Sequence, residues 1–468
     1  MKAASAVQNV DAVVANYLCT GCGACVAVCP QDAVGMVETA WGALYANRDG
    51  ARCVDCGLCA AVCPGWHLEE GTLPQGVDPF TGRVLAAYIC QATDRRLLAD
   101  AQSGGVATVL LYHLLESNEV DRAIVTQMPE DGTLRPRVLV TGDRQEIAKA
   151  CGSKYCPVPL NAALKTAIRP EEKLALVGLG CHIHALRNAQ VHGLHKSVRF
   201  SIGLICSGVG AYGHIDHLIG RAGLSRAQVV GFRFKSKKWQ GWPGDVAMRT
   251  RDGVEHNLLR AAFVSSRSVF APPCCRLCFD QLNVLSDVSV GDAHHLSDDP
   301  AGASLVLVRT QAGLDALGSA ASAGVLKLTP VEMHEAFGTC QTIELRRQAW
   351  TAYTRLWRQS QRMEPDFGIE DRWAAHVTRR AMAAYRRKLM WTLRVAGFGS
   401  PEQARRAQER RALAEELLAS AHPVRLAKRL KRILALSLRA LRPPASDHPG
   451  RTNQAAGKDP IPPKETKL

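Results

Sequence analysis

The sequence predicts an α/β domain with a mixed sheet and flanking helices, preceded by a small α+β cysteine-rich module and followed by a basic helical tail. Three observations lead to this prediction. Two near-copies of a twelve-residue cysteine phrase stand near the N-terminus, at residues 19–30 and 53–64. Apolar runs of strand length then alternate with helical patterns over residues 80–335, and Arg-rich helical patterns begin at about residue 341.

The two phrases, CTGCGACVAVCP and CVDCGLCAAVCP, both have the form C-x2-C-x2-C-x3-C-P. This spacing is typical of modules that bind two cuboidal 4Fe-4S clusters, in which the fourth cysteine of each phrase serves the other cluster. Zinc is the alternative, although zinc sites usually pair two C-x2-C units. We therefore expect a two-cluster ferredoxin module at residues 12–68, with each fourth cysteine at the start of a helix. The expected ligand sets are Cys19, Cys22, Cys25 and Cys63 for one cluster, and Cys53, Cys56, Cys59 and Cys29 for the other.

The middle of the chain, residues 80–335, follows a linker rich in Gly and Pro. Seven apolar runs predict strands: RAIVTQM, RVLVTG, LALVGL, VRFSIGLIC, VVGFRF, DVSVGDA and SLVLVRT. Five segments have a helical pattern: GGVATVLLYHLLES, PLNAALKTAI, HIHALRNAQVHG, GHIDHLIGRAG and GLDALGSAASAG. This alternation predicts one α/β domain. No G-x-G-x-x-G motif stands between a strand and a helix, so we expect no Rossmann nicotinamide site.

The charge of the chain is concentrated at its C-terminal end. Residues 341–468 hold 27 of the 58 Lys and Arg residues but only 12 of the 43 Asp and Glu residues, which accounts for the whole net charge of +15. The rest of the chain is neutral, so we expect no nucleic-acid binding. Residues 341–442 are predicted as a basic helical extension, in which VRLAKRLKRILALSLRALR could lie on an anionic membrane surface or pack on the body. The Pro-rich residues 443–468 are predicted to be disordered.

The sequence contains no apolar run of about 18 residues, so we expect no membrane-spanning helix. The N-terminal residues lack the apolar centre of a signal peptide, because Asn9 and Asp11 interrupt it. We therefore expect a cytoplasmic protein, peripheral at the inner membrane surface if the basic tail binds lipid. Clustered cysteines in a reducing compartment indicate metal or redox ligands rather than disulfides.

A series of motifs follows the cysteine phrases in a fixed order: AQSGGVATVLL, ACGSKYCPVPL, LALVGLGCHIHALR, SIGLICSGVG, GFRFKSKKWQGWP and CCRLCFDQLNVLSDVSVGDAHH. Over residues 15–335 the chain thereby resembles the beta-subunit family of the coenzyme F420-reducing hydrogenases and dehydrogenases. That family includes 7-hydroxymethyl chlorophyll reductase and the ferredoxin-type divinyl chlorophyllide 8-vinyl reductase. The resemblance implies a flavoprotein that holds FAD and a further 4Fe-4S cluster.

The function that this resemblance implies is electron transfer by an iron–sulfur flavoenzyme. Ferredoxin or a donor subunit would exchange electrons with the clusters and FAD, which would serve an organic two-electron acceptor such as coenzyme F420 or a tetrapyrrole. The alternative is a non-catalytic electron-transfer subunit of a larger hydrogenase, dehydrogenase or polysaccharide-related complex. The residues themselves do not decide between these two functions.

The resemblance also implies the ligands of the further cluster, namely Cys181, Cys206, Cys275 and Cys278. Cys274 could replace Cys275, and four separate buried cysteines are the alternative to a cluster. The chain departs from the family at its central cysteine, where Gly178, Leu179, Gly180, Cys181 and His182 stand in place of Gly-Thr-Pro-Cys-Gln. His182 is a weak candidate for a proton donor, and a polar residue at a helix start is the alternative.

The candidate flavin contacts are Gln102, Ser103, Gly104, Gly105, Lys154 and Lys235. The AQSGG stretch precedes an apolar helix, so its free backbone N–H groups could bind the flavin pyrophosphate; a plain Ser cap is the alternative. Lys154 could stabilise an anionic reduced ring and is the second weak catalytic candidate. Lys235, with Lys237 and Lys238, could bind a phosphate or an acidic coenzyme side chain, unless this loop is simply solvated.

Overall fold

The computed structural model describes residues 7–420 except 168, 170, 339–340 and 370–376. The chain divides into two units, Met1–Glu416 and Leu417–Leu468, and the description below concerns the first. The predicted membrane-surface helix at 424–442 and the predicted disordered segment at 443–468 lie outside the described residues. Within the described ranges, no helix combines the length and the apolar character needed to cross a membrane.

The cysteine-rich module is small and has an α+β fold. Its strands β1 (Val34–Glu38) and β2 (Leu44–Arg48) form an antiparallel pair. Its helices are α1 (Val10–Ala15), α2 (Ala24–Val28) and α3 (Leu58–Ala61). Gly23 and Gly57 cap the N-termini of α2 and α3 with φ of 81° and 77°, a left-handed conformation that favours glycine. Each cysteine phrase therefore folds as a tight loop that continues into a short helix.

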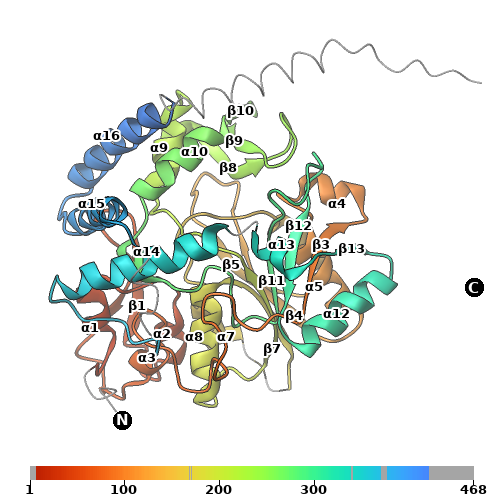
Figure 1. The fold of residues 1–468 in the computed structure, drawn as a ribbon, viewed down its shortest axis with the longest axis horizontal. Helices are drawn as coiled ribbons and strands as arrows, with labels where there is room; N and C mark the ends of the chain where they lie inside the picture. Colours follow the sequence, from red (N-terminus) through yellow and green to blue (C-terminus); the bar gives the residue numbers. More distant parts are fainter. Residues whose placement is uncertain (1–6, 168, 170, 339–340, 370–376, 421–468) are drawn as a thin grey trace, which may run out of the picture. The chain divides into compact units, whose positions relative to one another are not determined.

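The predicted mixed sheet is confirmed and has eight strands (Figure 1). From one edge to the other these are β13 (Leu326–Pro330), β3 (Ala86–Ala92), β12 (Ser304–Val308), β11 (Val288–Asp292), β7 (Val198–Leu204), β6 (Leu174–Leu179), β4 (Arg122–Gln127) and β5 (Arg137–Thr141). The four strands β11, β7, β6 and β4 are parallel. β5 pairs antiparallel with β4 at one edge, and β12, β3 and β13 add antiparallel pairings at the other.

Helices cover both faces of this sheet, and alternate residues of its strands enter two separate cores. Leu174, Leu176 and Leu305 belong to one core, whereas Ala175 and Val306 belong to the other. The first core is closed by η1 (Leu160–Ala163), α7 (Leu164–Ala167), α8 (Gly180–Val191) and α13 (Met333–Gly338). The second is closed by α4 (Arg95–Asp100), α5 (Val106–Glu116), α6 (Arg144–Lys149) and α12 (Gln311–Ser322).

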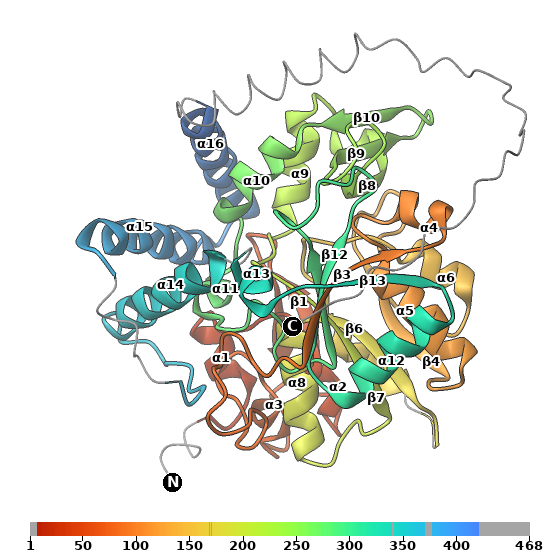
Figure 2. The same cartoon turned by 45° about the vertical axis from the view of Figure 1, so that its right-hand side comes forward.

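A second sheet stands apart from the first and has its own core. The antiparallel strands β8 (Val229–Ser236), β9 (Asp245–Thr250) and β10 (Glu255–Leu258) pack with α9 (Gly213–Arg221) and α10 (Arg260–Ser266) (Figure 2). The predicted strand VVGFRF forms β8 and so lies in this second sheet. Short helical segments η2 (Arg226–Gln228) and η3 (Arg267–Val269) flank it, and α11 (Pro273–Leu277) leads back toward the mixed sheet.

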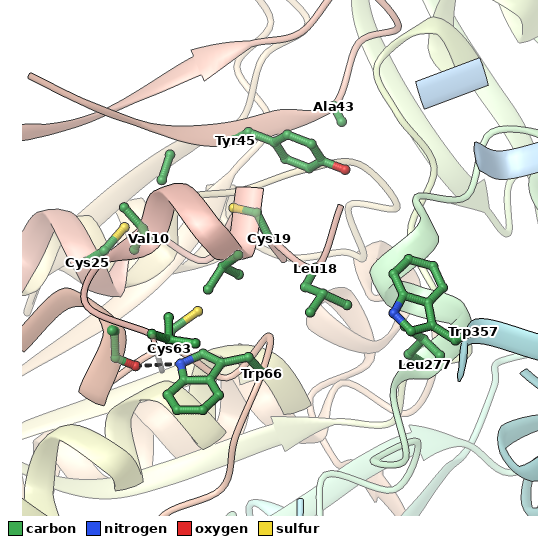
Figure 3. Close-up of a cluster of buried hydrophobic side chains, with 14 of the residues drawn as sticks. Val10, Leu18, Cys19, Cys25, Ala43, Tyr45, Cys63, Trp66, Leu277 and Trp357 are labelled. Carbon is green, nitrogen blue, oxygen red and sulfur yellow. Dashed lines mark hydrogen bonds between the residues drawn. The ribbon is translucent and has the colours of Figure 1, made fainter. Parts of the chain in front are cut away.

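The C-terminal extension packs on the rest of this unit. Its helices are α14 (Gln341–Arg358), α15 (Arg379–Ala396) and α16 (Pro401–Ser420). α14 places Ile343 and Trp350 in a core of the mixed sheet, and Tyr353 and Trp357 in the core of the cysteine-rich module. Figure 3 shows Trp357 beside Leu277 of α11 in the module core. α14 therefore joins the module to the sheet domain.

Candidate redox site

Two cavities in the module are each lined by four cysteines. The Cys63 cavity, named for the residue that comes from the other phrase, is lined by Cys19, Cys22, Cys25 and Cys63. The Cys29 cavity is lined by Cys29, Cys53, Cys56 and Cys59. The structure thus brings together the two sets of cysteines that the spacing predicts.

Each cavity takes three cysteines from one phrase and one from the other, and the short helices explain this exchange. α2 carries Cys25 toward one cavity, and Cys29 caps the end of α2 and lines the other. α3 likewise carries Cys59, and Cys63 follows it. The expectation that each fourth cysteine starts a helix is wrong, because the intervening residues themselves form the helix. The third and fourth cysteines of each phrase therefore lie near opposite ends of a short helix and line different cavities.

The two cavities differ in their exposure to solvent. All four cysteines of the Cys63 cavity are buried, whereas Cys56 in the Cys29 cavity is exposed. Burial raises the pKa of Cys19 to about 11. Burial and repulsion between neighbouring thiolates raise the pKa of Cys25 well above its ordinary value. Four such thiolates would be stable together only around a cationic centre, which is the chemistry that iron ions supply.

A third cavity, the body cavity, is lined by cysteines from four separate segments: Cys156, Cys181, Cys206, Cys274, Cys275 and Cys278. Cys181 lies in the first turn of α8 and Cys206 follows β7. α11 carries the adjacent pair, and Cys278 caps its C-terminal end. The four cysteines that the family resemblance implies therefore line one cavity, together with Cys156 and Cys274.

Charged side chains accompany these cysteines. Burial raises the pKa of Cys206 to about 11 and the pKa of Cys278 to about 12, and the positive charge of Arg346 on α14 opposes both increases. A hydrogen bond from the thiol of Cys274 lowers the pKa of Cys275. That bond favours Cys275 as the thiolate and Cys274 as the thiol of the pair.

Each of the three cysteine-lined cavities has at least four cysteines in its wall, as a cuboidal cluster requires. Within the described ranges, no three His, Cys, Asp or Glu side chains converge closely enough to hold one metal ion. A cuboidal cluster has its irons at separate corners, so its four thiolates surround a cavity instead of meeting at one point. The three cysteine-lined cavities have that arrangement.

A fourth cavity, the sheet-end cavity, lies at the carboxyl ends of the parallel strands β4, β6, β7 and β11. Its lining includes Thr126, Leu179, Leu204 and Asp292 from these four strands. Ligands of open α/β sheets commonly bind outside the carboxyl ends of the strands. Five of the six predicted flavin contacts line this cavity: Gln102, Ser103, Gly105, Lys154 and Lys235.

The loop before α5 forms part of this cavity. The Gln102 side chain accepts a hydrogen bond from the backbone N–H of Ser153 at 2.8 Å, and Ser103 donates to the carbonyl oxygen of Ala303. Gly105 caps α5 with φ of 75°. Gly104 does not line the cavity, because it packs against the sheet, where a Cβ atom would lie 2.3 Å from the carbonyl oxygen of Cys90. Its role is close packing against the strand.

Two buried lysines face the sheet-end cavity. Burial lowers the pKa of Lys154 to about 8, and its Nζ donates to the carbonyl oxygen of Ala150 at 2.5 Å. Lys235 forms an ion pair with Asp292, and Tyr155 and Asp292 together raise the pKa of Lys235 in spite of its burial. Asp292 is a functional candidate that the sequence interpretation left aside.

The neighbouring lysines do not form a free cationic cluster. Lys237 donates to the carbonyl oxygens of Leu98, Ser103 and Ala301, and burial lowers its pKa to about 8. Lys238 forms an exposed ion pair with Glu255. The interpretation of Lys237 and Lys238 as phosphate ligands is therefore not supported by their contacts.

His182 lies between the sheet-end cavity and the body cavity and lines both. Its Nδ1 accepts the backbone N–H of Leu179 at 3.1 Å, and its Nε2 is 3.0 Å from the carbonyl oxygen of Val158. Burial lowers its pKa to about 4. A neutral imidazole with both nitrogens engaged is suited to fixing the start of α8, and this geometry does not support a proton-donor role.

The four cavities follow one another through shared or adjacent walls. The Cys29 and Cys63 cavities lie at opposite ends of α2 and α3. Thr20 and Pro64 line both the Cys63 cavity and the body cavity. Val158, Leu179 and His182 line both the body cavity and the sheet-end cavity. A continuous series therefore leads from exposed Cys56 to the ends of the parallel strands.

A further cavity, the side cavity, adjoins the sheet-end cavity. The two share Gln102 and the loop from Cys151 to Lys154. The rest of its lining includes Lys149, Arg233, Glu130, Phe232 and Phe234. It therefore combines basic and aromatic side chains beside the two buried lysines.

Comparisons with known proteins agree with this architecture. Residues 18–65 match the family described as "4Fe-4S dicluster domain". Residues 87–165 match "Coenzyme F420 hydrogenase/dehydrogenase, beta subunit N-term", and residues 171–334 match the C-terminal counterpart of the same beta-subunit family. The cysteine-rich module is therefore a 4Fe-4S dicluster domain, and the zinc alternative is wrong.

Similar proteins come from archaea and plants. The chain is 28% identical to coenzyme F420 hydrogenase subunit beta of Methanosarcina barkeri over 54% of this chain and 85% of that protein. It is 26% identical to the chloroplastic 7-hydroxymethyl chlorophyll a reductase of Oryza sativa subsp. japonica over 41% of this chain and 40% of that protein. A chain in the structure of the F420-reducing [NiFe] hydrogenase complex from Methanosarcina barkeri is 25% identical, with a TM-score of 0.45 and coverage of 58% of this chain and 96% of that chain.

The matched segments include the strands and loops that form the body and sheet-end cavities, and the dicluster domain precedes them. The relatives that carry a functional name are oxidoreductases. The N-terminal and C-terminal models of the beta-subunit family together match more than half of the chain. The chain therefore belongs to the coenzyme F420 hydrogenase/dehydrogenase beta-subunit family of iron–sulfur oxidoreductases.

Proposed function

We propose that the protein is an iron–sulfur flavoenzyme that moves electrons between ferredoxin, or a donor subunit, and an organic two-electron acceptor. The observation that carries the proposal is the series of four cavities with shared or adjacent walls. Such a series suits electron transfer because each redox centre would lie next to the following one. The exposed Cys29 cavity is the natural point of contact with the electron donor.

The chain's own residues define where each group would be held. The Cys29 and Cys63 cavities would hold the two clusters of the dicluster domain. The body cavity would hold a third 4Fe-4S cluster on Cys181, Cys206, Cys275 and Cys278, the four cysteines that the family resemblance implies.

The sheet-end cavity would hold FAD. A flavin accepts electrons singly and delivers them in pairs, which is the conversion that this function requires. Lys154 would place a positive charge beside the ring, and the ion pair of Lys235 with Asp292 would close one wall of the cavity. Gln102 would hold the Ser153 loop that borders the cavity. His182 would separate this cavity from the body cavity and exclude water there.

The acceptor would approach through the side cavity. Phe232 and Phe234 offer apolar ring surfaces, and Lys149 and Arg233 offer positive charge. These side chains suit a flat ring system with acidic substituents, a description that fits both coenzyme F420 and an acidic tetrapyrrole. The proposed acceptor is therefore an anionic, conjugated molecule.

Anaerobic purification tests the cofactor assignment. We expect about 12 iron atoms per chain, at four per cluster, and FAD released on denaturation. A content of about eight iron atoms together with FAD would contradict only the assignment of the third cluster. A protein that contains iron but no flavin would contradict the flavoenzyme proposal and would be an iron–sulfur electron carrier.

A second candidate function is a non-catalytic subunit, because the similar Methanosarcina protein is a hydrogenase subunit. Turnover distinguishes the two. We expect purified protein with reduced ferredoxin to reduce coenzyme F420 or a chlorophyll-type acceptor without a partner. Full cofactor content combined with turnover only after addition of a partner subunit would favour the second function.

A further inference from the structure

The C-terminal extension contributes a charged side chain to the body cavity. Arg346, on α14, lines this cavity together with its cysteines. α14 begins after the matched family segment, which ends at residue 334. Arg346 is thus supplied by a part of the chain that the family comparison does not cover.

One donor of the Arg346 side chain, Nε, is buried and is left unpaired within the part of the chain that the structure describes. Buried N–H groups are normally satisfied, so an unpaired one at a cavity wall indicates a group bound in the cavity. No other Lys or Arg is found among the described residues that line this cavity.

The helix holds Arg346 in place from both sides. Ile343 and Trp350 anchor α14 in a core of the mixed sheet, and Trp357 anchors it in the module core. The neighbouring Arg347 forms an ion pair with Asp78, which fixes the adjacent position on the helix. The guanidinium is therefore held at the cavity by a rigid element.

We propose that Arg346 raises the reduction potential of the body cluster, and that the C-terminal extension thereby tunes the step between the dicluster domain and the flavin. This inference rests on the proposed third cluster. A cluster with four thiolates is an anion that gains one more negative charge on reduction, so a nearby cation favours the reduced form. An N–H group pointing at a cluster sulfur acts in the same direction.

Other charges near the cavity are compatible with this role. Asp280 lines the cavity and Oδ1 accepts the backbone N–H of Val284 at 2.9 Å. Asp280 is the same in the wild type and in the variants below, so the shift expected on substitution of Arg346 does not depend on its charge. Arg276 points elsewhere, since it donates to the carbonyl oxygen of Ser268 and lies over the ring of Tyr353.

Potentiometric titration followed by EPR tests the proposal on the full chain. Arg346→Gln should shift the midpoint potential of the body cluster to more negative values and leave the two dicluster-domain clusters unchanged. Arg346→Lys keeps the charge and should stay near the wild-type potential. Cys278→Ser, which removes a ligand of the body cluster, identifies its signal.

Arg358→Gln is the matched control. It removes the same charge from the same helix, but Arg358 forms an exposed ion pair with Glu364 and lies about 18 Å farther along the axis at 1.5 Å per residue. We expect no shift for this variant. An unchanged body-cluster potential in Arg346→Gln, with about 12 iron atoms bound, would overturn the inference and spare the proposed function. A wild-type protein with only two clusters would overturn both.

Discussion

Lys235 and Asp292 form a buried ion pair in the wall of the sheet-end cavity, with side chains only 5% and 16% exposed. Lys235 comes from β8 of the second sheet, and Asp292 ends β11 of the mixed sheet. The pair therefore joins the two sheets at the proposed flavin site. The indole of Trp242 also donates toward Asp292, at 3.4 Å.

Asp292→Asn should destabilise the protein and reduce its flavin content, because it leaves the Lys235 ammonium buried without its counter-charge. Loss of one partner of a buried pair costs about 3–5 kcal/mol of unfolding free energy. Chemical denaturation and the flavin to protein ratio measure the two effects. Lys238→Gln breaks the exposed pair with Glu255 and should cost about 0–1 kcal/mol. Equal effects of the two variants would contradict the role assigned to the buried pair.

Pairs of cysteine substitutions test the crossed ligand sets. Cys29→Ser combined with Cys53→Ser affects one cavity, so about eight of the 12 expected irons should remain. Cys29→Ser combined with Cys25→Ser affects both cavities of the module, so about four should remain. Iron analysis and EPR of anaerobic samples measure the outcome. If the first double variant instead kept about four irons and the second about eight, each phrase would hold its own cluster.

The sequence predicted the parts of the fold that have strong local patterns. The dicluster spacing and the central strands β6, β7, β11 and β12 were predicted correctly, because strands that are buried on both faces of a sheet are nearly continuous apolar runs. Of the two larger sheets, β3, β9, β10 and β13 were not predicted. The polar or half-exposed residues of β10 and β13 resemble a loop, and the pairing of β3 between β12 and β13 depends on distant residues.

The candidate site was predicted in part for the same reason. The two cysteine phrases have a recognisable spacing, and the family resemblance pointed to the body-cavity cysteines and the AQSGG loop, so their placement at the cavities was foreseeable. Asp292 and Arg346 have no such pattern. Asp292 ends β11 of the mixed sheet, but its partner Lys235 comes from the second sheet, and Arg346 reaches the body cavity through the C-terminal extension. No local sequence feature encodes these long-range relationships.

The buried His214 predicts a loss of stability in acid. Burial, with the nearby His217 and Arg267, lowers its pKa well below the usual value, and its ring stacks on Phe270 at 4.8 Å. Since the pKa of His214 is lowered in the folded state, the folded chain binds fewer protons than the unfolded chain below about pH 6.5. The free energy of unfolding should therefore fall as the pH decreases from about 6.5, by up to about 1.4 kcal/mol per pH unit for this residue.

His214→Gln checks the contribution of this imidazole. Gln keeps a hydrogen-bonding group toward Ser266, which lies 2.9 Å from Nε2 of His214, but it does not titrate. Denaturation curves between pH 5 and pH 7 should show a slope smaller by about one proton in the variant. An identical slope in both proteins would mean that His214 binds its proton equally well in the folded state.

A substitution at Trp357 tests how strongly the dicluster domain depends on the C-terminal extension for its stability. Its side chain is fully buried in the module core, and its Nε1 donates to the carbonyl oxygen of Met363 at 2.8 Å. Trp357→Ala should lower the free energy of unfolding by about 3–5 kcal/mol and hasten iron loss from the module. Leu345→Ala, at a 55% exposed position of the same helix, should stay within about 0.5 kcal/mol of wild type. Denaturation and the rate of iron release to a chelator measure these effects, and a Trp357→Ala protein that keeps wild-type iron retention would show that the module holds its clusters without help from α14.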